Sequence, residues 1–274
     1  ANKGFVDGLK ERGFEEGKNI TIDRQNAQAD QSNLQNIAQR FVSAKMDLIC
    51  AIATPAAQTM ANATHDIPIV GTAITDYEGA KLVASNKEPK GNVTGTSDMN
   101  PVKEQIDLLL KIKTIGTVYC SSEVNSEVQV KAMKEYAESK GLTVKVATIS
   151  TVNDIQQAAQ SLIGSVDAFY EPTDNIIASA MPTLIDITNA AKVPVICGEP
   201  NMVKAGGLAT YGIDYYKLGV QTGHMAADIL EGKKPASMPI EMAKDLKVTV
   251  NKANAALLGI TFPEDVLKDA DVIE

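Results

Sequence analysis

Apolar residues along this chain follow two periods that alternate. Short continuous apolar runs are typical of strands buried on both faces of a sheet. Between them, apolar residues recur every three or four positions, which predicts amphipathic helices. Strands that alternate with helices build parallel sheets covered by helices, so the expected fold class is α/β with doubly wound parallel sheets. We expect strands at residues 19–23, 47–53, 67–73, 91–96, 115–120, 142–149, 166–170, 193–197, 208–213 and 246–250, and helices at 5–13, 32–42, 100–110, 130–140, 153–163, 174–191, 215–231, 252–258 and 263–269, with a further helix that starts at 54.

The order of elements in the first half of the chain returns in the second half. Residues 46–50 resemble residues 165–169, with an Asp entering each strand, and residues 67–70 resemble residues 193–196. Two copies of one architecture predict two similar lobes. We place the N-terminal lobe at 1–98 plus 213–245 and the C-terminal lobe at 99–212 plus 246–274. Three crossings between lobes would form a multi-strand hinge that lets them close over a ligand.

The first copy lacks a counterpart to one strong strand of the second copy. The second copy opens with the strand at 115–120, whereas the chain begins inside the helix that would follow such a strand. We therefore expect the N-terminal lobe to lack its first strand in this numbering, unless another segment supplies it. The omission would be costly, because a central parallel strand provides ladder hydrogen bonds to both neighbours.

Small polar residues follow several of the expected strands. In an open parallel sheet, ligands bind beyond the carboxyl ends of the strands, where helix N-termini present their N–H groups. Any single Ser or Thr there could be a simple helix cap, but the set as a whole favours a binding cleft. The candidate ligand-binding residues are Thr54, Pro55, Ala56, Gln58, Thr75, Ser121, Ser122, Asn125, Tyr170, Thr173, Asp174, Asn175, Glu199 and Asp214.

Composition narrows the classes of partner. The chain has 274 residues, of which 44% are hydrophobic and 22% charged, a composition that is ordinary for a folded α/β protein. Its net charge of −8 argues against nucleic acid as a partner, because binding to a phosphate backbone needs clustered cations. The only arginines are Arg12, Arg24 and Arg40, so no guanidinium is available later in the chain to bind a carboxylate or phosphate.

Motifs typical of enzymes and metal sites are missing. We find no Gly-x-Ser-x-Gly, Gly-x-Gly-x-x-Gly, Walker or His-Glu-x-x-His pattern. His65 and His224 are solitary, and the three cysteines are widely spaced with no histidine near in sequence. No apolar run approaches the ~20 residues of a membrane span, and no secretion signal opens the chain. We expect no enzyme activity, no cofactor and no metal.

Three segments together resemble one family. They are residues 92–98, residues 164–175 and residues 209–219. In combination they are similar to the bacterial ABC-transporter substrate-binding lipoproteins associated with uptake of tryptophan, tyrosine and phenylalanine. The resemblance implies a type I periplasmic-binding-protein fold, a lipid-anchored extracytoplasmic receptor and a membrane permease as partner. We also expect the protein to be a monomer. In that family a signal peptide, a lipid-bearing cysteine and the first strand would precede this numbering.

The implied ligand is an amino acid, preferentially aromatic. Without arginine, its carboxylate would bind helix N–H groups and hydroxyls near 54–58 and 121–122, and its ammonium would bind Asp174, Glu199 or Asp214. Four aromatic residues could flank its side chain or simply pack in the core, namely Tyr77, Phe169, Tyr170 and Tyr211. Two alternatives stay open: a receptor for a branched-chain amino acid, and a cytosolic sensor domain like those of sugar-responsive repressors.

Overall fold

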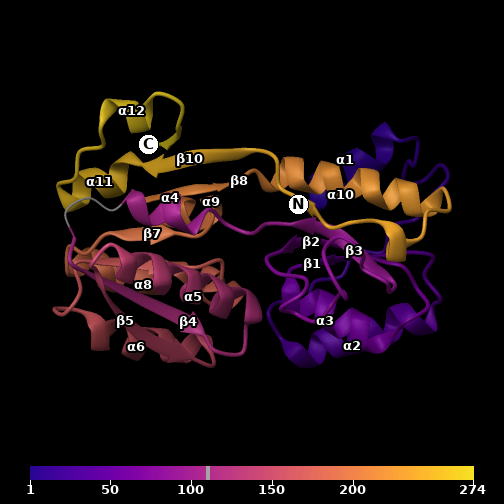
Figure 1. Ribbon diagram of the computed structural model, residues 1–274, viewed down its shortest axis with the longest axis horizontal. Helices are drawn as coiled ribbons and strands as arrows, with labels where there is room; N and C mark the ends of the chain where they lie inside the picture. The colour runs from indigo at the N-terminus through magenta and orange to yellow at the C-terminus, as the bar shows by residue number, and fades with distance from the viewer. Residues whose placement is uncertain (109–111) are drawn as a thin grey trace. The chain divides into compact units, whose positions relative to one another are not determined.

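The protein divides into two compact α/β units. The computed structural model describes residues 1–108 and 112–274 (Figure 1). Unit 1 comprises Ala1–Met99 and Asp214–Asp245, and unit 2 comprises Asn100–Ile213 and Leu246–Glu274. The chain therefore passes between units after residues 99, 213 and 245, where the sequence analysis places the crossings after 98, 212 and 245.

Unit 1 contains a small parallel sheet with helices on both faces. Its strand order is β1-β2-β3-β9, and all three neighbouring pairs are parallel. In Figure 1, α1 and α10 lie on one side of this sheet and α2 and α3 on the other. The strands are β1 (Ile49–Ile52), β2 (Ile69–Ile74), β3 (Val93–Ser97) and β9 (Glu241–Met242), and the helices are α1 (Asn2–Glu11), α2 (Gln31–Ser43), α3 (Thr54–Ala63), α10 (Tyr215–Leu230) and the 3-10 turn η2 (Pro235–Ser237).

The strand expected at residues 19–23 is absent, and that prediction is wrong. Only one bridge, between Glu16 and Ile20, involves this segment. In unit 2 the comparable edge strand, β5 (Thr143–Ile149), pairs along its whole length with β4 (Thr114–Cys120). The described part of unit 1 contains no counterpart of β4, so β1 lies at the edge of its sheet. An extended segment without a neighbour to receive its backbone hydrogen bonds does not become a strand.

Unit 2 contains a larger mixed sheet. Its strand order is β11-β10-β8-β7-β6-β4-β5, and the β8–β10 pair is antiparallel while the others are parallel. The antiparallel pair arises because β10 follows a passage of the chain through unit 1. The short last strand was not expected from the sequence. The remaining strands are β6 (Ala168–Glu171), β7 (Val195–Cys197), β8 (Ala209–Ile213), β10 (Leu246–Asn251) and β11 (Asp271–Ile273).

Helices cover both faces of this larger sheet. Residues of α6, α7 and α8 join one apolar core with Phe169, and residues of α4, α5 and α11 join another with Tyr170. Two neighbouring residues of β6 thus point to opposite cores, as the pleat of a strand requires. The helices are α4 (Val102–Asp107), α5 (Val124–Ser139), the 3-10 turn η1 (Val152–Asp154), α6 (Ile155–Leu162), α7 (Asn175–Ser179), α8 (Met181–Ala190), α9 (Pro200–Lys204), α11 (Lys252–Leu258) and α12 (Glu264–Leu267).

Some helix boundaries differ from the expected ones. The single helix expected at 174–191 is two helices, with a break at Ala180. Pro182 follows this break and has no N–H with which to continue the ladder, so it fits only the first turn of α8. The C-terminal end of the helix expected at 100–110 falls at residues 109–110, outside the described residues.

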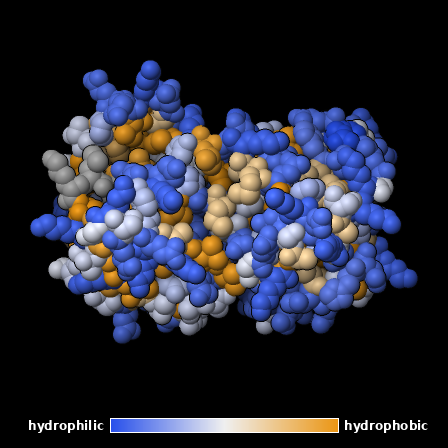
Figure 2. Space-filling model, in the orientation of Figure 1, coloured by the Kyte–Doolittle hydropathy of each residue, from blue (hydrophilic) through white to orange (hydrophobic). Residues whose placement is uncertain are grey.

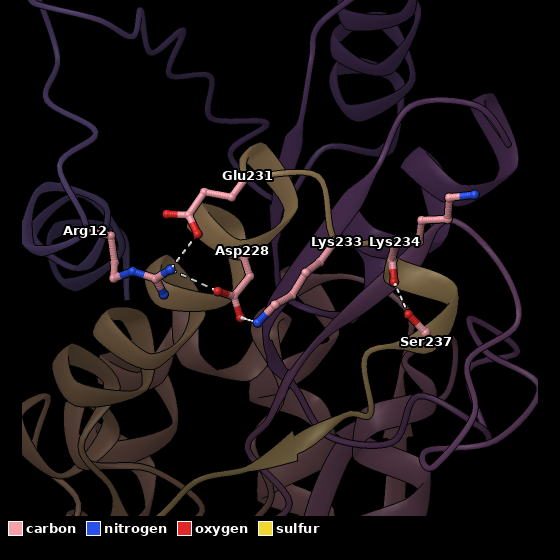
Figure 3. Close-up of polar contacts among 6 residues, drawn as sticks. All are labelled: Arg12, Asp228, Glu231, Lys233, Lys234 and Ser237. Atoms are coloured by element: carbon pink, nitrogen blue, oxygen red, sulfur yellow. Dashed lines mark hydrogen bonds and ion pairs between the residues drawn. The ribbon is translucent and has the colours of Figure 1, made fainter.

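Helices α1 and α10 pack at very short range in unit 1. Gly4 and Gly8 of α1 face the backbone of α10, and Gly219 and Gly223 of α10 face the backbone of α1. At the far end of this contact, the Arg12 guanidinium lies 3.0 Å from Asp228 Oδ1 and 2.9 Å from Glu231 Oε2 (Figure 3). Exposed ion pairs of this kind contribute little, so the glycine contact dominates the packing.

The described residues contain no helix that is both long and apolar enough to cross a bilayer. The face of the protein in Figure 2 is mostly hydrophilic, with apolar residues in scattered patches.

Candidate functional site

The N-terminus of α3 in unit 1 is open. Its N-cap is Ala53, which has no side chain able to accept a hydrogen bond and has a φ of 78°. Thr54 is 2% exposed, and its Oγ1 has no hydrogen-bond partner among the described residues. A positive φ at alanine is strained, and such strain concentrates at functional sites. This end of α3 can therefore bind an anion through backbone N–H groups and a hydroxyl.

Five other helices close their own N-termini with a side chain. In each of these helices, the N-cap side chain accepts hydrogen bonds from backbone N–H groups of the first turn. The caps of α2, α7, α9, α10 and α11 are, in that order, Asp30, Asp174, Glu199, Asp214 and Asn251. These caps satisfy N–H groups that would otherwise be free to meet a ligand. Helix α3, which follows the carboxyl end of β1, shares the lack of a side-chain cap with several other helices, among them α1, α4 and α8. It is distinguished by the positive φ of Ala53 and by the Thr54 hydroxyl, which has no partner among the described residues.

All three acidic residues that the sequence analysis offers to an ammonium are helix caps. Glu199 accepts from Asn201 N at 2.8 Å and Met202 N at 3.0 Å, and Asp214 accepts from Tyr216 N at 2.9 Å and Lys217 N at 3.1 Å. The capping interpretation therefore accounts for their positions without a ligand. Their ligand-binding role stays a prediction.

Asp174 is enclosed by donors within unit 2. It is fully buried, and its carboxylate accepts from Cys120 N at 2.7 Å, Ser126 Oγ at 2.8 Å and Ile177 N at 2.9 Å. These bonds join the end of β4, the start of α5 and the start of α7. Asp174 thus holds the loops at the carboxyl ends of β4 and β6 together.

Glu123 is a second buried carboxylate, and the sequence analysis did not select it. It lies between two selected residues in the loop after β4. It accepts from Asn125 Nδ2 at 2.9 Å, Asn175 N at 3.0 Å, Asn175 Nδ2 at 2.6 Å and Ile176 N at 3.1 Å. The structure therefore joins Asn125, Asp174 and Asn175 in one polar cluster. An acidic residue inside a run of small polar residues was the available signal.

Burial raises the pKa of Asp174 to about 6, and the charge of Glu123 contributes in the same direction against three hydrogen bonds. A third carboxylate, Glu171, is fully buried on β6, and burial raises its pKa well above the usual range. Its Oε1 accepts from Val118 N at 3.1 Å, and its Oε2 has no partner among the described residues. The carboxyl ends of β4 and β6 therefore bring several carboxyl groups together, and burial disfavours the charged forms of Asp174 and Glu171.

The raised pKa predicts a pH dependence of stability. An unfolded aspartate has a pKa of about 3.9, so folding favours the protonated form of Asp174. This contribution to the free energy of unfolding is present below about pH 4 and is lost as the pH rises through about 6. Asp174→Asn cannot titrate, so its unfolding free energy should lack that part of the decline. Urea unfolding at pH 4 and pH 6.5 checks this, and equal declines in both proteins would contradict it.

A network of carboxamides lies beside these carboxylates. Asn100 Nδ2 donates to Gln129 Oε1 at 2.9 Å and to Thr173 Oγ1, and Asn125 Nδ2 donates to Thr173 O at 2.8 Å. Asn100 is 6% exposed and Asn125 is 4% exposed, yet the Oδ1 atom of each has no partner among the described residues. Of these two asparagines, the sequence analysis selected only Asn125. Asn100 precedes Pro101 and was interpreted simply as the start of a helix.

The remaining candidates have varied surroundings. Gln58 Nε2 donates to Ala80 O at 3.2 Å, and Ser122 Oγ lies 3.1 Å from Cys120 Sγ. Pro55 and Ala56 form the first turn of α3, and Ser121 is exposed. Thr75 Oγ1 donates to Asp98 Oδ1 at 3.2 Å.

Asp98, the acceptor of this bond, is a buried carboxylate that the sequence analysis did not select. Burial raises its pKa, opposed by hydrogen bonds from the Tyr215 and Thr75 hydroxyls.

Three of the four aromatic candidates are core residues. Tyr77, Phe169 and Tyr170 are fully buried within their own units. Tyr77 donates to Thr96 O at 3.0 Å, and Tyr170 donates to Gln105 Oε1 at 3.0 Å. Core packing is therefore enough to explain these three residues without a ligand. Tyr211, the fourth candidate, is only partly buried.

The family model of ABC transporter substrate binding proteins matches residues 1–273. The chain belongs to this family. It is 44% identical over 256 residues to a protein named tyrosine-binding protein from Clostridioides difficile, an alignment that covers 92% of this chain and 74% of that protein. It is also similar to a solved Streptococcus pneumonia ABC domain in complex with L-Trp, with 43% identity, a TM-score of 0.95, and coverage of 99% of this chain and 93% of that one. A solved Vibrio cholerae conserved domain protein shows 40% identity, a TM-score of 0.95 and the same coverage of both chains.

Family membership fixes the general role of this substrate-binding protein. The type I periplasmic-binding-protein fold implied by the resemblance is confirmed. Proteins of this family act outside the cytoplasmic membrane and deliver a captured ligand to an ABC permease. Binding of a transported substrate is the role that defines this family. Membership favours the receptor interpretation over a repressor-like sensor domain.

Proposed function

We propose that this substrate-binding protein captures an amino acid, with preference for an aromatic one, for import by an ABC transporter. The similarity to the domain in complex with L-Trp carries the proposal, because 43% identity extends over 99% of this chain. The name of the tyrosine-binding relative supports the same ligand class.

The open N-terminus of α3 supports the proposal on chemical grounds. An α-amino acid brings a carboxylate, and unit 2 contains no arginine, while the three arginines of unit 1 pair with Asp228, Glu231, Glu16 and Asp23. Backbone N–H groups and the Thr54 hydroxyl are then suitable donors for a carboxylate. Thr54 would gain the partner that its buried oxygen lacks.

The proposed aromatic preference does not depend on Tyr77, Phe169 or Tyr170, because each is fully buried in the core of its own unit. It depends on the relatives, with Tyr211 as the one partly exposed aromatic candidate. The proposal extends to a lipid anchor, which the resemblance to lipoproteins supports, and to a monomeric state.

Native mass spectrometry of the protein purified from its own cells tests the ligand, the anchor and the oligomeric state together. We expect a monomer that carries the mass of a lipid and releases an aromatic amino acid. Added L-Trp or L-Tyr at about 100 times its Kd should then stabilise the protein by about 2.7 kcal/mol in thermal unfolding. Stabilisation by ribose or a nucleoside, with none from the aromatic amino acids or from leucine, would overturn the amino-acid assignment.

A further inference from the structure

We propose that the carboxamide oxygens of Asn100 and Asn125 bind the ammonium group of the amino-acid ligand. The inference rests on the proposed function and adds the identity of two acceptors in unit 2. It transfers the ammonium role from the three capping carboxylates to two neutral side chains.

The hydrogen-bond network fixes which way each carboxamide faces. Thr173 N can only donate, and it lies 3.1 Å from Gln129 Oε1, so that atom of Gln129 is the oxygen. The atom of Asn100 that faces this oxygen at 2.9 Å must therefore be its nitrogen. Similarly, Thr173 O can only accept, so the atom of Asn125 at 2.8 Å must be its nitrogen. Both Oδ1 assignments follow from backbone groups.

These two oxygens are buried acceptors for which the described part of the chain offers no partner. Asn100 is 6% exposed and Asn125 is 4% exposed. Both carboxamide nitrogens bond to the same residue, Thr173, so the two side chains are close neighbours. A buried acceptor that lacks a donor is costly, and native proteins rarely leave one unexplained. Two together indicate a place prepared for a group with several donors, and an ammonium has three.

The surrounding charge selects a cation. Glu123 Oε2 accepts from Asn125 Nδ2 at 2.9 Å, and Asp174 lies one residue from Thr173. Glu123 and Asp174 interact electrostatically, and unit 2 has no arginine to offset them. Each carboxylate already accepts three or more hydrogen bonds from the protein, so its charge favours a nearby cation without direct contact. A bound carboxylate would meet repulsion at the same place.

The test compares two ligands that differ only in the ammonium group. Isothermal titration calorimetry would give the Kd of L-Trp and of indole-3-propionate for the wild-type protein, Asn100→Ala and Asn125→Ala. We expect each substitution to weaken L-Trp binding by about 10- to 100-fold, the usual range for a hydrogen bond to a charged group. Binding of indole-3-propionate should change by less than about threefold, because it has no ammonium to lose.

A matched control comes from another buried asparagine of unit 2. Asn254 is 6% exposed, and its Nδ2 donates to Asn189 Oδ1 at 2.9 Å. Asn254→Ala removes a buried carboxamide of the same kind outside the proposed site, so it should leave both Kd values unchanged. Thermal unfolding of all variants shows how much each substitution affects folding.

The outcomes separate the inference from the proposed function. Equal losses for both ligands in Asn100→Ala and Asn125→Ala would show a positioning role only and overturn the inference. Unchanged L-Trp binding in both variants would overturn it too, since water would then satisfy the oxygens. If wild-type protein binds neither the aromatic amino acids nor leucine, the proposed function itself fails.

Discussion

Replacing Gly8 with alanine is expected to lower the free energy of unfolding of unit 1 by about 3 kcal/mol, at the upper end of the usual cost of overpacking. A Cβ at this position would lie 2.4 Å from Val220 O and 3.0 Å from Val220 Cα. Both are backbone atoms of α10, so no side chain can rotate away. Helix propensity alone would predict a gain of up to about 1 kcal/mol, and the sign of the effect therefore decides which factor dominates.

Gly91→Ala is the matched control for Gly8→Ala. A Cβ at Gly91 meets nothing within 4 Å, and the residue does not have a positive φ. Its unfolding free energy in urea should stay within about 0.5 kcal/mol of wild type. If Gly8→Ala is as stable as Gly91→Ala, the close approach of α1 and α10 is not a constraint on the fold.

Asp174→Ala is expected to lower the free energy of unfolding of unit 2 by about 3 kcal/mol, the cost of stranding several buried donors. The substitution removes the acceptor of Cys120 N, Ser126 Oγ and Ile177 N, all in a fully buried environment. Urea unfolding monitored by circular dichroism measures the effect. The sequence analysis offers Asp174 as one of three candidate partners for the ligand's ammonium, and its hydrogen bonds add a structural role that predicts this loss of stability.

Asp214→Ala provides the comparison for Asp174→Ala. Asp214 also caps a helix through two backbone N–H groups, but it is exposed to solvent. Water can satisfy those donors, so the expected cost is only about 1 kcal/mol. An Asp174→Ala protein that is as stable as wild type but fails to bind L-Trp would restore Asp174 as the ammonium partner.

The candidate ligand-binding residues show that one sequence pattern can serve two different roles. An acidic or hydroxyl residue after a strand can close the next helix or contact a ligand, and both roles use the same residue types at the same place. Asp174, Glu199 and Asp214 close helices. Thr54 begins a helix that no side chain of the described residues caps. Which role applies depends on the φ of Ala53 and on the neighbours of each carboxylate, and neither can be deduced from local composition.

The βα order, the division into two similar units and the family could be predicted from sequence, because each depends on periodicity or on short local motifs. Apolar runs such as 67–73 and 193–197 become strands wherever a neighbouring strand receives their hydrogen bonds. Residues 19–23 have a strand-like pattern but no such neighbour among the described residues, so the pattern alone fails. Pairing is a property of two segments, and a single segment cannot specify it.

The sequence by itself determined a doubly wound α/β fold with few arginines, because hydrophobic period and composition act locally along the chain. Only the tertiary structure decided that Tyr77 and Tyr170 belong to cores and that Glu123 and Asp174 share one cluster. It also decided that Asn100 and Asn125 meet at Thr173. Asn100 and Thr173 are far apart in sequence, and their contact arises because α4 and β6 pack in the same unit. Burial and the absence of a partner exist only once such distant segments have come together.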